Sequence, residues 1–292
     1  MTREIAPIDV MAAFEVNPPE LDFVIPGLLS GTVGVIYSPG GVGKSFLALE
    51  IMASVAGVDL LGLGLHNTGR SLYIALEDPA IVLRRRLHAI GEHLSISQRE
   101  IFAVKVEILP MMGVPFDLLS QDGLYADWLN KRAAGARLVV IDTLSRAHSG
   151  DESSNGEMAQ LLRVLERICV STGAAILFLH HVNKGSGRDR NGDQFSIRGA
   201  SALVDNARFA AAITYELEDD KPAARVRIRY SVSKSNYAAP IAPRYFVRHA
   251  GGVLLPEPQE LRQDHKIKAR PGLAIPSGSP YLAAKNGELH AW

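Results

Sequence analysis

The feature that most constrains this chain is a glycine-rich octapeptide that lies between a strand-like run and a helix-like run. The apolar run 34–37 precedes it, the run 46–51 follows it, and the octapeptide is Ser38-Pro39-Gly40-Gly41-Val42-Gly43-Lys44-Ser45. A buried strand, a loop and a helix start in this order form a phosphate-binding P-loop, because glycines let backbone N–H groups point at the phosphate. Lys44 is expected to reach the β- and γ-phosphates, and the Ser45 hydroxyl to bind Mg²⁺. The octapeptide therefore predicts a site for ATP and Mg²⁺.

The first position of the octapeptide departs from the usual pattern G-x-x-x-x-G-K-[ST], because Ser38 stands where glycine is usual. Pro39 and Gly40 follow it, and both residue types favour a turn, so the bend around the phosphate is retained. The alternative is a chance glycine-rich turn. The strand before it, the helix after it and the Gly-Lys-Ser ending all favour the P-loop.

Beyond the P-loop, apolar strand-like runs alternate with helical patterns, which predicts an α/β fold. Strands are expected over residues 33–37, 71–76, 104–109, 137–141 and 174–179, and helices over 45–56, 81–92, 125–134 and 157–170. Alternation of this kind implies βαβ units, so we expect a mostly parallel twisted sheet with helices on both faces.

The later part of the chain predicts an antiparallel extension of this sheet. Residues 200–209 have a helical pattern, the turn 218–222 joins two strand-like runs, and those runs and a last hairpin cover residues 210–216, 225–233, 245–248 and 253–255. The polar, basic segment 183–193 before them is expected to be a mobile loop.

Three regions follow from these patterns: an N-terminal arm over residues 1–30, an ATPase core over 31–256 and a disordered tail over 257–292. The arm holds one short amphipathic helix, which Pro18 and Pro19 end. Such a short helix is unstable alone, so it must dock on its own domain or on a neighbouring subunit. The tail is rich in proline, glycine and serine and lacks apolar periodicity.

Composition limits the partners and the compartment. The chain has 31 Lys and Arg residues and 31 Asp and Glu residues, so any nucleic-acid binding must come from local loops rather than from overall charge. The single cysteine, Cys169, excludes an internal disulfide and suits a reducing cytoplasm. We expect neither a membrane span nor a signal peptide, because no apolar run is long enough and the N-terminus lacks a basic region followed by an apolar core.

Polar residues that ATP hydrolysis needs follow the predicted strands. Glu77 and Asp78 follow the second strand, Asp142 ends an apolar run in a Walker B pattern, and His180 and His181 end the strand over residues 174–179. Because ligands bind at the carboxyl ends of parallel strands, we expect these groups to lie near the P-loop. Asp142 is then a Mg²⁺ ligand and Glu77 the base that polarises the attacking water.

Simpler roles remain open for some of these residues. Asp78 precedes Pro79, as a helix-capping residue does. His181 is expected to sense the γ-phosphate, but either histidine of the pair can equally be a satisfied structural residue. Metal binding by the pair is not expected without a third ligand nearby.

Phosphoryl transfer also requires cations near the γ-phosphate besides Lys44. The candidates are Arg198, Arg208 and Lys234, none of which is close to the P-loop in sequence. An arginine finger supplied by a neighbouring subunit is therefore the expected role of Arg208. The alternative for each is a solvated surface side chain.

The order of these motifs resembles that of the RecA-type P-loop ATPases. The motifs are the P-loop, Leu76-Glu77-Asp78-Pro79, Val140-Ile141-Asp142-Thr143-Leu144, Phe178-Leu179-His180-His181, Arg198-Gly199-Ala200-Ser201 and Val204-Asp205-Asn206-Ala207-Arg208. The sequence is similar more closely to the RepA-type hexameric replicative DNA helicases of broad-host-range plasmids, over about residues 5–255. That similarity includes the Ser-Pro-Gly-Gly opening of the P-loop and the segment Lys234-Ser235-Asn236-Tyr237.

The resemblance implies a homohexameric ring that hydrolyses ATP at its subunit interfaces. In such a ring Lys44, Ser45, Asp142 and Glu77 keep the roles given above, His181 couples the γ-phosphate to the DNA-binding loops, and Arg208 is the finger. Single-stranded DNA passes through the channel on two loops, near residues 145–156 and 184–195. The N-terminal helix docks on the adjacent subunit, and the direction of unwinding is 5′ to 3′.

Charges in the two loops set what they are expected to contact. Lys184, Arg188 and Arg190 in the second loop suit DNA phosphates, in a mode that tolerates any sequence. The first loop is acidic, and Arg146 is its one evident phosphate partner. Both loops have few aromatic residues, which speaks against base stacking.

Three functions compete at this point. The first is an ATP-driven DNA helicase of a plasmid or mobile element, which the long basic loop favours. The second is a regulatory ATPase that switches oligomerisation or contacts with DNA or protein without unwinding. The third is a nucleotide-binding scaffold, which the pair Glu77 and Asp142 argues against, because a scaffold needs no catalytic base.

Overall fold

The computed structural model describes residues 6–151, 154–182, 201–216 and 227–258. Residues up to Glu257 belong to one compact unit. The expected loop over 184–195, Arg198, the turn over 218–222 and the tail from residue 259 lie outside the described residues.

The described helices and strands follow the predicted α/β alternation. The strands are β1 (Phe23–Ile25), β2 (Leu28–Leu29), β3 (Val33–Ser38), β4 (Arg70–Ala75), β5 (Val106–Pro110), β6 (Ala136–Asp142), β7 (Ala175–His181), β8 (Phe209–Glu216), β9 (Arg227–Ser235), β10 (Arg244–Arg248) and β11 (Leu254–Pro256). The helices are α1 (Val10–Glu15), α2 (Lys44–Ala56), α3 (Ala80–Gly91), α4 (Ile96–Lys105), α5 (Leu124–Ala133), α6 (Asn155–Thr172) and α7 (Ser201–Asn206), with 3-10 turns η1 (Leu144–Arg146) and η4 (Ala250–Gly252).

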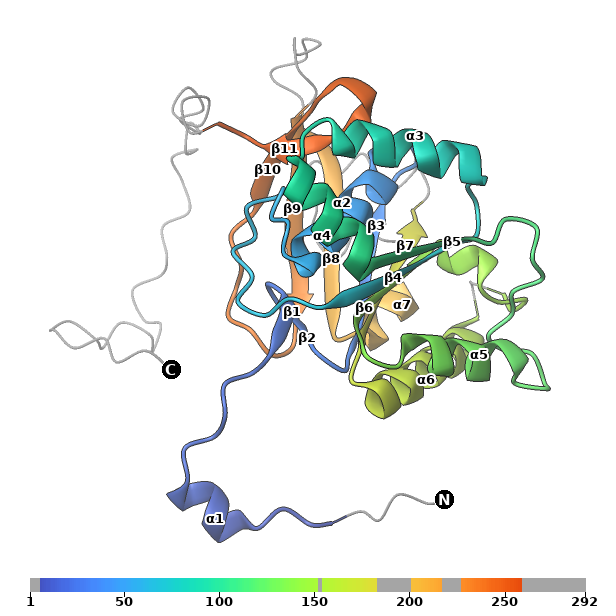
Figure 1. The fold of residues 1–292 in the computed structure, drawn as a ribbon. Coiled ribbons are helices and arrows are strands. Elements are labelled where there is room, and N and C mark those ends of the chain that lie inside the picture. Colours follow the sequence, from blue (N-terminus) through green and yellow to red (C-terminus); the bar gives the residue numbers. More distant parts are fainter. Residues whose placement is uncertain (1–5, 152–153, 183–200, 217–226, 259–292) are drawn as a thin grey trace, which may run out of the picture. The chain divides into compact units, whose positions relative to one another are not determined.

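Nine of the described strands form the central sheet, in the order β11-β10-β9-β8-β3-β7-β6-β4-β5 (Figure 1). The strands from β8 to β5 in this order are parallel, and β9, β10 and β11 continue the sheet antiparallel. The predicted fold class is confirmed. The P-loop strand β3 lies between β7 and β8, and β8 in turn pairs with β9, the first strand of the antiparallel extension.

Helices cover both faces of the sheet and bury a separate apolar core on each (Figure 1). Strand β6 shows why, because its side chains alternate: Leu138 and Val140 belong to the core under α2, α3 and α4. Val139 and Ile141 belong to the core under α5, α6 and α7. The apolar runs of the sequence are thus strands buried on two faces, as parallel sheets require.

The core begins earlier in the chain than residue 31, where the sequence patterns start it. Strands β1 and β2 pair as an antiparallel hairpin, and Val24, Ile25 and Leu28 of this hairpin are completely or almost completely buried in the α2 core. These strands are three and two residues long, which is too short for a periodic pattern to be visible.

Two other boundaries differ from the expectation. Residues 104 and 105 end helix α4 rather than begin a strand, so β5 starts at Val106. The helix expected over 200–209 stops at Asn206, and Phe209 already pairs with Gly34 as the first residue of β8. The helix ends here because Phe209 pairs with the P-loop strand, beside which its side chain is fully buried.

The compact unit ends on a bidentate ion pair. Arg227 Nε lies 2.8 Å from Glu257 Oε1, and Arg227 Nη2 lies 2.8 Å from Oε2. The Glu257 side chain is 3% exposed, and the Arg227 guanidinium also lies over the Tyr245 ring. These contacts fasten the residue after β11 to the start of β9.

Helix α1 buries none of its residues. Its apolar side chains Val10, Met11 and Phe14 are between 58% and 77% exposed. Among the described helices none is both long and apolar enough to cross a membrane.

Candidate active site

The sheet brings the predicted site residues to one edge. Strands β3, β7, β6 and β4 are parallel neighbours, so their carboxyl ends present Ser38, His181, Asp142 and the segment after Ala75 together. A pocket of about 320 Å³ opens there. Its lining residues are Gly41, Gly43, Lys44, Ser45, Phe46, Glu77, Asp78, Arg86, His181, Arg248 and Gly252.

The P-loop wraps around the start of α2 as the sequence predicts. Gly41 and Gly43 have φ values of +83° and +113°, a region that L-residues with side chains rarely adopt, and Gly43 is the N-cap of α2. The helix begins at Lys44, so the unpaired N–H groups of its first turn lie at the pocket. This arrangement is suited to an anion such as a phosphate group.

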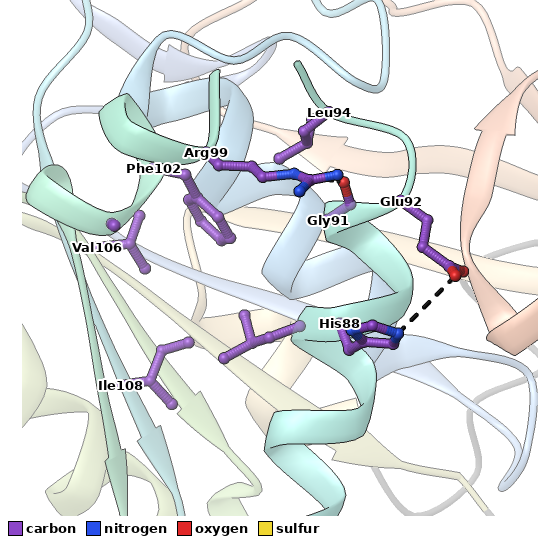
Figure 2. Close-up of a pocket in the computed structure, with 10 residues that line it drawn as sticks. His88, Gly91, Glu92, Leu94, Arg99, Phe102, Val106 and Ile108 are labelled. Carbon is purple, nitrogen blue, oxygen red and sulfur yellow. Dashed lines mark hydrogen bonds and ion pairs between the residues drawn. The ribbon is translucent and has the colours of Figure 1, made fainter. Parts of the chain in front are cut away.

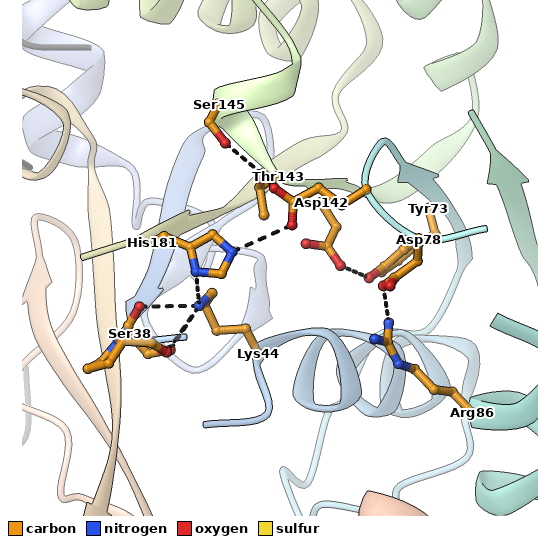
Figure 3. Close-up of polar contacts among 11 residues, drawn as sticks. Ser38, Lys44, Tyr73, Asp78, Arg86, Asp142, Thr143, Ser145 and His181 are labelled. Atoms are coloured by element: carbon orange, nitrogen blue, oxygen red, sulfur yellow. Dashed lines mark hydrogen bonds and ion pairs between the residues drawn. The ribbon is translucent and has the colours of Figure 1, made fainter. Parts of the chain in front are cut away.

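The Lys44 ammonium lies among oxygen and nitrogen acceptors (Figure 3). Its Nζ is 3.0 Å from Ser38 Oγ, 3.2 Å from the Ser38 carbonyl oxygen and 3.1 Å from His181 Nδ1. Burial lowers the pKa of Lys44 to about 8, although the carboxylates of Asp142 and Glu77 oppose this shift. Ser38, the unusual first residue of the P-loop, therefore accepts hydrogen bonds from the Lys44 ammonium.

Glu77 is oriented by two partners at the strand ends. Its Oε2 lies 3.5 Å from His181 Nε2, and the Thr143 hydroxyl donates to its Oε1 at 2.8 Å. The hydrogen bond from His181 lowers the pKa of Glu77, partial burial opposes the shift, and Thr143 lowers the pKa further. Glu77 is thus held as a carboxylate, the form that a general base requires.

Asp142 is buried at the end of β6 and has its own partners. The Tyr73 hydroxyl of β4 donates to Oδ2 (Figure 3), and Asp142 also hydrogen-bonds with the Ser45 hydroxyl. Burial raises the pKa of Asp142, and these two hydrogen bonds oppose that shift. A hydroxyl and a carboxylate side by side fit Mg²⁺, which prefers oxygen ligands and takes few of them from the protein. The peptide bond between Asp142 and Thr143 is cis.

Asp78 does not cap the helix that follows it. Pro79 is the N-cap residue of α3, without a side-chain cap, and Asp78 forms an ion pair with Arg86 of the same helix. The capping interpretation of Asp78 is therefore wrong. The pair places Arg86 beside the pocket, where its guanidinium lies 5.7 Å from the centre of the Phe46 ring.

The two histidines at the end of β7 point to different surroundings. His181 reaches the pocket, whereas the His180 side chain is buried and does not line it. Burial, together with the nearby His181, Lys44 and His148, lowers the pKa of His180 to about 4. His180 therefore has the environment of a structural histidine.

The cations proposed from the sequence do not line this pocket in the part of the chain that the structure describes. The Arg208 side chain is exposed, and the Lys234 ammonium donates to the Val204 carbonyl oxygen at 3.1 Å. Two arginines that sequence reasoning missed, Arg86 and Arg248, do line it. No spacing rule connects them to the P-loop, because tertiary packing alone brings them there.

A second pocket of about 370 Å³ lies between α3, α4 and β5 (Figure 2). Its walls are mostly apolar, including Leu94, Phe102, Val106 and Ile108. The Arg99 guanidinium at this pocket donates to the Gly91 carbonyl oxygen at 2.9 Å. None of the P-loop residues lines it.

Comparisons with known proteins show the family and the fold of this chain. Residues 2–187 match the AAA_25 family model, described as an AAA domain. Among solved structures, the crystal structure of the RadB recombinase superposes with a TM-score of 0.51 at 15% identity, over 77% of this chain and 91% of that one. At this identity the match shows the fold, which is RecA-like.

Proposed function

Since this chain belongs to the AAA_25 family of AAA domains and is a RecA-type P-loop ATPase, we propose that it hydrolyses ATP to translocate along single-stranded DNA. The observation that carries the ATPase proposal is the chain of contacts from Lys44 through His181 to Glu77, beside the pair of Ser45 and Asp142. These are the groups needed to bind phosphates, hold a metal ion and polarise water.

Each group has one task in this reaction. The P-loop N–H groups and Lys44 bind the phosphates, while Ser45 and Asp142 would hold Mg²⁺, which neutralises charge on the β- and γ-phosphates. Glu77 accepts a proton from the attacking water. His181, which contacts both Lys44 and Glu77, is placed to respond to the γ-phosphate.

The proposal of DNA binding rests on the segments that follow the strands of the site. Strand β6 ends at Asp142 and is followed by the expected first DNA loop over residues 145–156, and β7 ends at His181, shortly before the expected second loop over 184–195. A change at Asp142 or His181 is thus a few residues from segments that carry Arg146, Lys184, Arg188 and Arg190. Electrostatic contacts with the DNA backbone suit these residues.

Ring assembly, as a homohexamer, is proposed from two exposed features. The apolar residues of α1 have no partner within the described part of the chain, which favours docking on a neighbouring subunit. Arg208 is exposed and outside its own pocket, as a residue that acts in the next subunit's site must be. ATP would then bind at each interface and require residues from two subunits.

The decisive experiment measures ATP turnover with and without single-stranded DNA for the wild type, Lys44→Ala and Arg208→Ala. We expect DNA to stimulate the wild type and both variants to lose turnover. Mixing the two variants should restore part of the activity, because some interfaces then combine an intact P-loop with an intact finger. Arg163→Ala, which removes an exposed arginine of α6, is the matched control.

The alternative is a regulatory ATPase whose nucleotide state switches assembly or contacts with DNA or protein. Turnover without DNA binding or stimulation would favour this alternative over the translocase. Absence of turnover in every assembly state would reject both. Strand displacement on a forked DNA substrate then separates a helicase from a translocase that does not unwind.

A further inference from the structure

Two side chains, one from β8 and one from β10, donate hydrogen bonds to carbonyl oxygens of the P-loop. The Tyr215 hydroxyl donates to the Gly41 carbonyl oxygen at 2.7 Å. Arg248 Nη2 donates to the same oxygen at 3.2 Å and also to the Val42 carbonyl oxygen. Two consecutive P-loop carbonyls are therefore fixed by groups that lie more than 170 residues away in sequence.

These two side chains are themselves held in place. Tyr215 lies in β8 and Arg248 ends β10, and the guanidinium of Arg248 is 5.7 Å from the centre of the Tyr215 ring. The segment after Arg248 packs on the P-loop helix: a Cβ at Gly252 would come within 2.6 Å of the Phe46 ring, and Glu50 Oε1 accepts from the Leu254 N–H at 2.8 Å. Arg248 is thus followed directly by a segment that packs on the P-loop helix.

These contacts affect phosphate binding through the geometry of the peptide bond. In a trans peptide the C=O and the following N–H point in opposite directions. Hydrogen bonds that fix the directions of the Gly41 and Val42 carbonyls therefore also fix the directions of the Val42 and Gly43 N–H groups, which point the opposite way. The positive φ values of Gly41 and Gly43 are those that let successive N–H groups converge on an anion.

We propose that Arg248 and Tyr215 are positioning residues that orient the P-loop N–H groups toward the phosphates of the nucleotide. This proposal rests on the proposed ATPase function. Arg248 also brings a positive charge to the loop, and a donor on a carbonyl oxygen polarises the N–H of the same peptide. Both effects strengthen the binding of an anion inside the loop.

The test compares steady-state ATP hydrolysis by the wild type, Arg248→Gln, Arg248→Lys and Tyr215→Phe. Phosphate binding by the loop is shared by the ground state and the transition state, so KM should change more than kcat. We expect KM to rise about tenfold in Arg248→Gln and about threefold in Tyr215→Phe, because a charged hydrogen bond is worth more than a neutral one. Arg248→Lys keeps one donor, and its KM should lie between those of the wild type and Arg248→Gln.

Arg244→Gln is the matched control. Arg244 lies in the same strand β10 and also donates to a backbone carbonyl, that of Gly62 at 2.7 Å, but it does not contact the P-loop. Its KM should equal that of the wild type. Melting temperatures of all variants show whether a KM change is merely a loss of folded protein.

Two results would overturn the proposal. One is an unchanged KM in both Arg248→Gln and Tyr215→Phe. The other is complete recovery in Arg248→Lys with no effect of Tyr215→Phe, which is the signature of a direct charge contact with the nucleotide. A wild type that neither binds nor hydrolyses ATP would instead reject the ATPase function itself.

Discussion

Lys44 and His181 are in direct contact, with 3.1 Å between Nζ of the P-loop lysine and Nδ1 of the imidazole at the end of β7. Because an ammonium group only donates, Nδ1 is the acceptor, and the neutral ring then carries its proton on Nε2. That nitrogen faces Glu77 at 3.5 Å. The His181 ring therefore connects Lys44 directly with Glu77, the residues proposed to bind phosphate and to act as the base.

The first prediction concerns the pH dependence of nucleotide binding. Burial lowers the Lys44 pKa to about 8, and phosphate binds the ammonium form, so raising the pH through 8 removes the proton that binding needs. We expect affinity for ADP and ATP to fall above pH 8, by up to about tenfold per pH unit. Calorimetry in buffers of different ionisation enthalpy should show proton uptake on binding at pH 8.5. Absence of proton uptake would contradict this assignment.

The second prediction concerns His181 and the acid limb of the ATPase pH profile. The hydrogen bond from His181 is the main cause of the lowered Glu77 pKa, and burial acts in the opposite direction. His181→Ala should therefore raise the Glu77 pKa and shift the acid limb of kcat to higher pH, with a loss that is larger at pH 6 than at pH 8. His88→Ala is the control, because His88 is exposed, lies outside the P-loop pocket and pairs with Glu92 at 3.8 Å.

A third prediction concerns Tyr73, which donates to Asp142 from the neighbouring strand. Tyr73→Phe keeps the buried ring and removes only the hydroxyl. The hydrogen bond lowers the pKa of Asp142, so its loss raises that pKa and weakens the carboxylate as a Mg²⁺ ligand. We expect the Mg²⁺ concentration for half-maximal turnover to rise about fivefold, a typical effect of losing one hydrogen bond. An unchanged Mg²⁺ requirement would leave Tyr73 with a packing role only.

A fourth prediction concerns stability and the buried carboxyl of Glu50. Burial raises its pKa well above 4.5, so the folded state binds a proton that the unfolded state releases above pH 4.5. The free energy of unfolding should fall as pH rises from 4.5 toward the raised pKa of the folded state. Glu50→Gln should remove this dependence and raise the free energy of unfolding at pH 7 by about 1 kcal/mol.

Glu50→Ala provides the contrast for that prediction. It removes the acceptor of the Leu254 N–H and opens a cavity, so it should destabilise by about 3 kcal/mol. Urea unfolding at pH 5 and pH 7 measures all three proteins. Equal stability of the wild type and Glu50→Gln at both pH values would show that the carboxyl is not the source of the dependence.

The sequence predicted the part of the site that depends on short motifs. The P-loop and Glu77 follow strands, and Asp142 and His181 end strands, at positions that local patterns reveal. Parallel pairing of these strands then brings the residues together. Helix α4 was not predicted, although Ser95 and Gln98 form a capping box at its start, and the strand expected over 104–109 overlapped its end.

Other parts of the site depend on contacts between distant segments and had no local signal. Tyr73 lies in an apolar strand and looks like an ordinary core residue in the sequence. Its role becomes visible in the structure, where its buried hydroxyl donates to Asp142. Tyr215 and Arg248 reach the P-loop because β8 pairs with β3 and the antiparallel strands that follow bring the end of β10 near the loop. The hairpin Phe23–Leu29 was missed because its two strands are too short to show alternation.

The ion pair between Arg227 and Glu257 has a practical meaning for anyone who shortens this chain. A protein that stops before Glu257 would leave the Arg227 guanidinium, whose side chain is 14% exposed, without its carboxylate. It would also loosen β10 and β11, the strands that bring Arg248 and Gly252 to the nucleotide pocket. Truncations and fusion points therefore belong after residue 257, where they preserve both the Arg227–Glu257 ion pair and the residues that line the P-loop pocket.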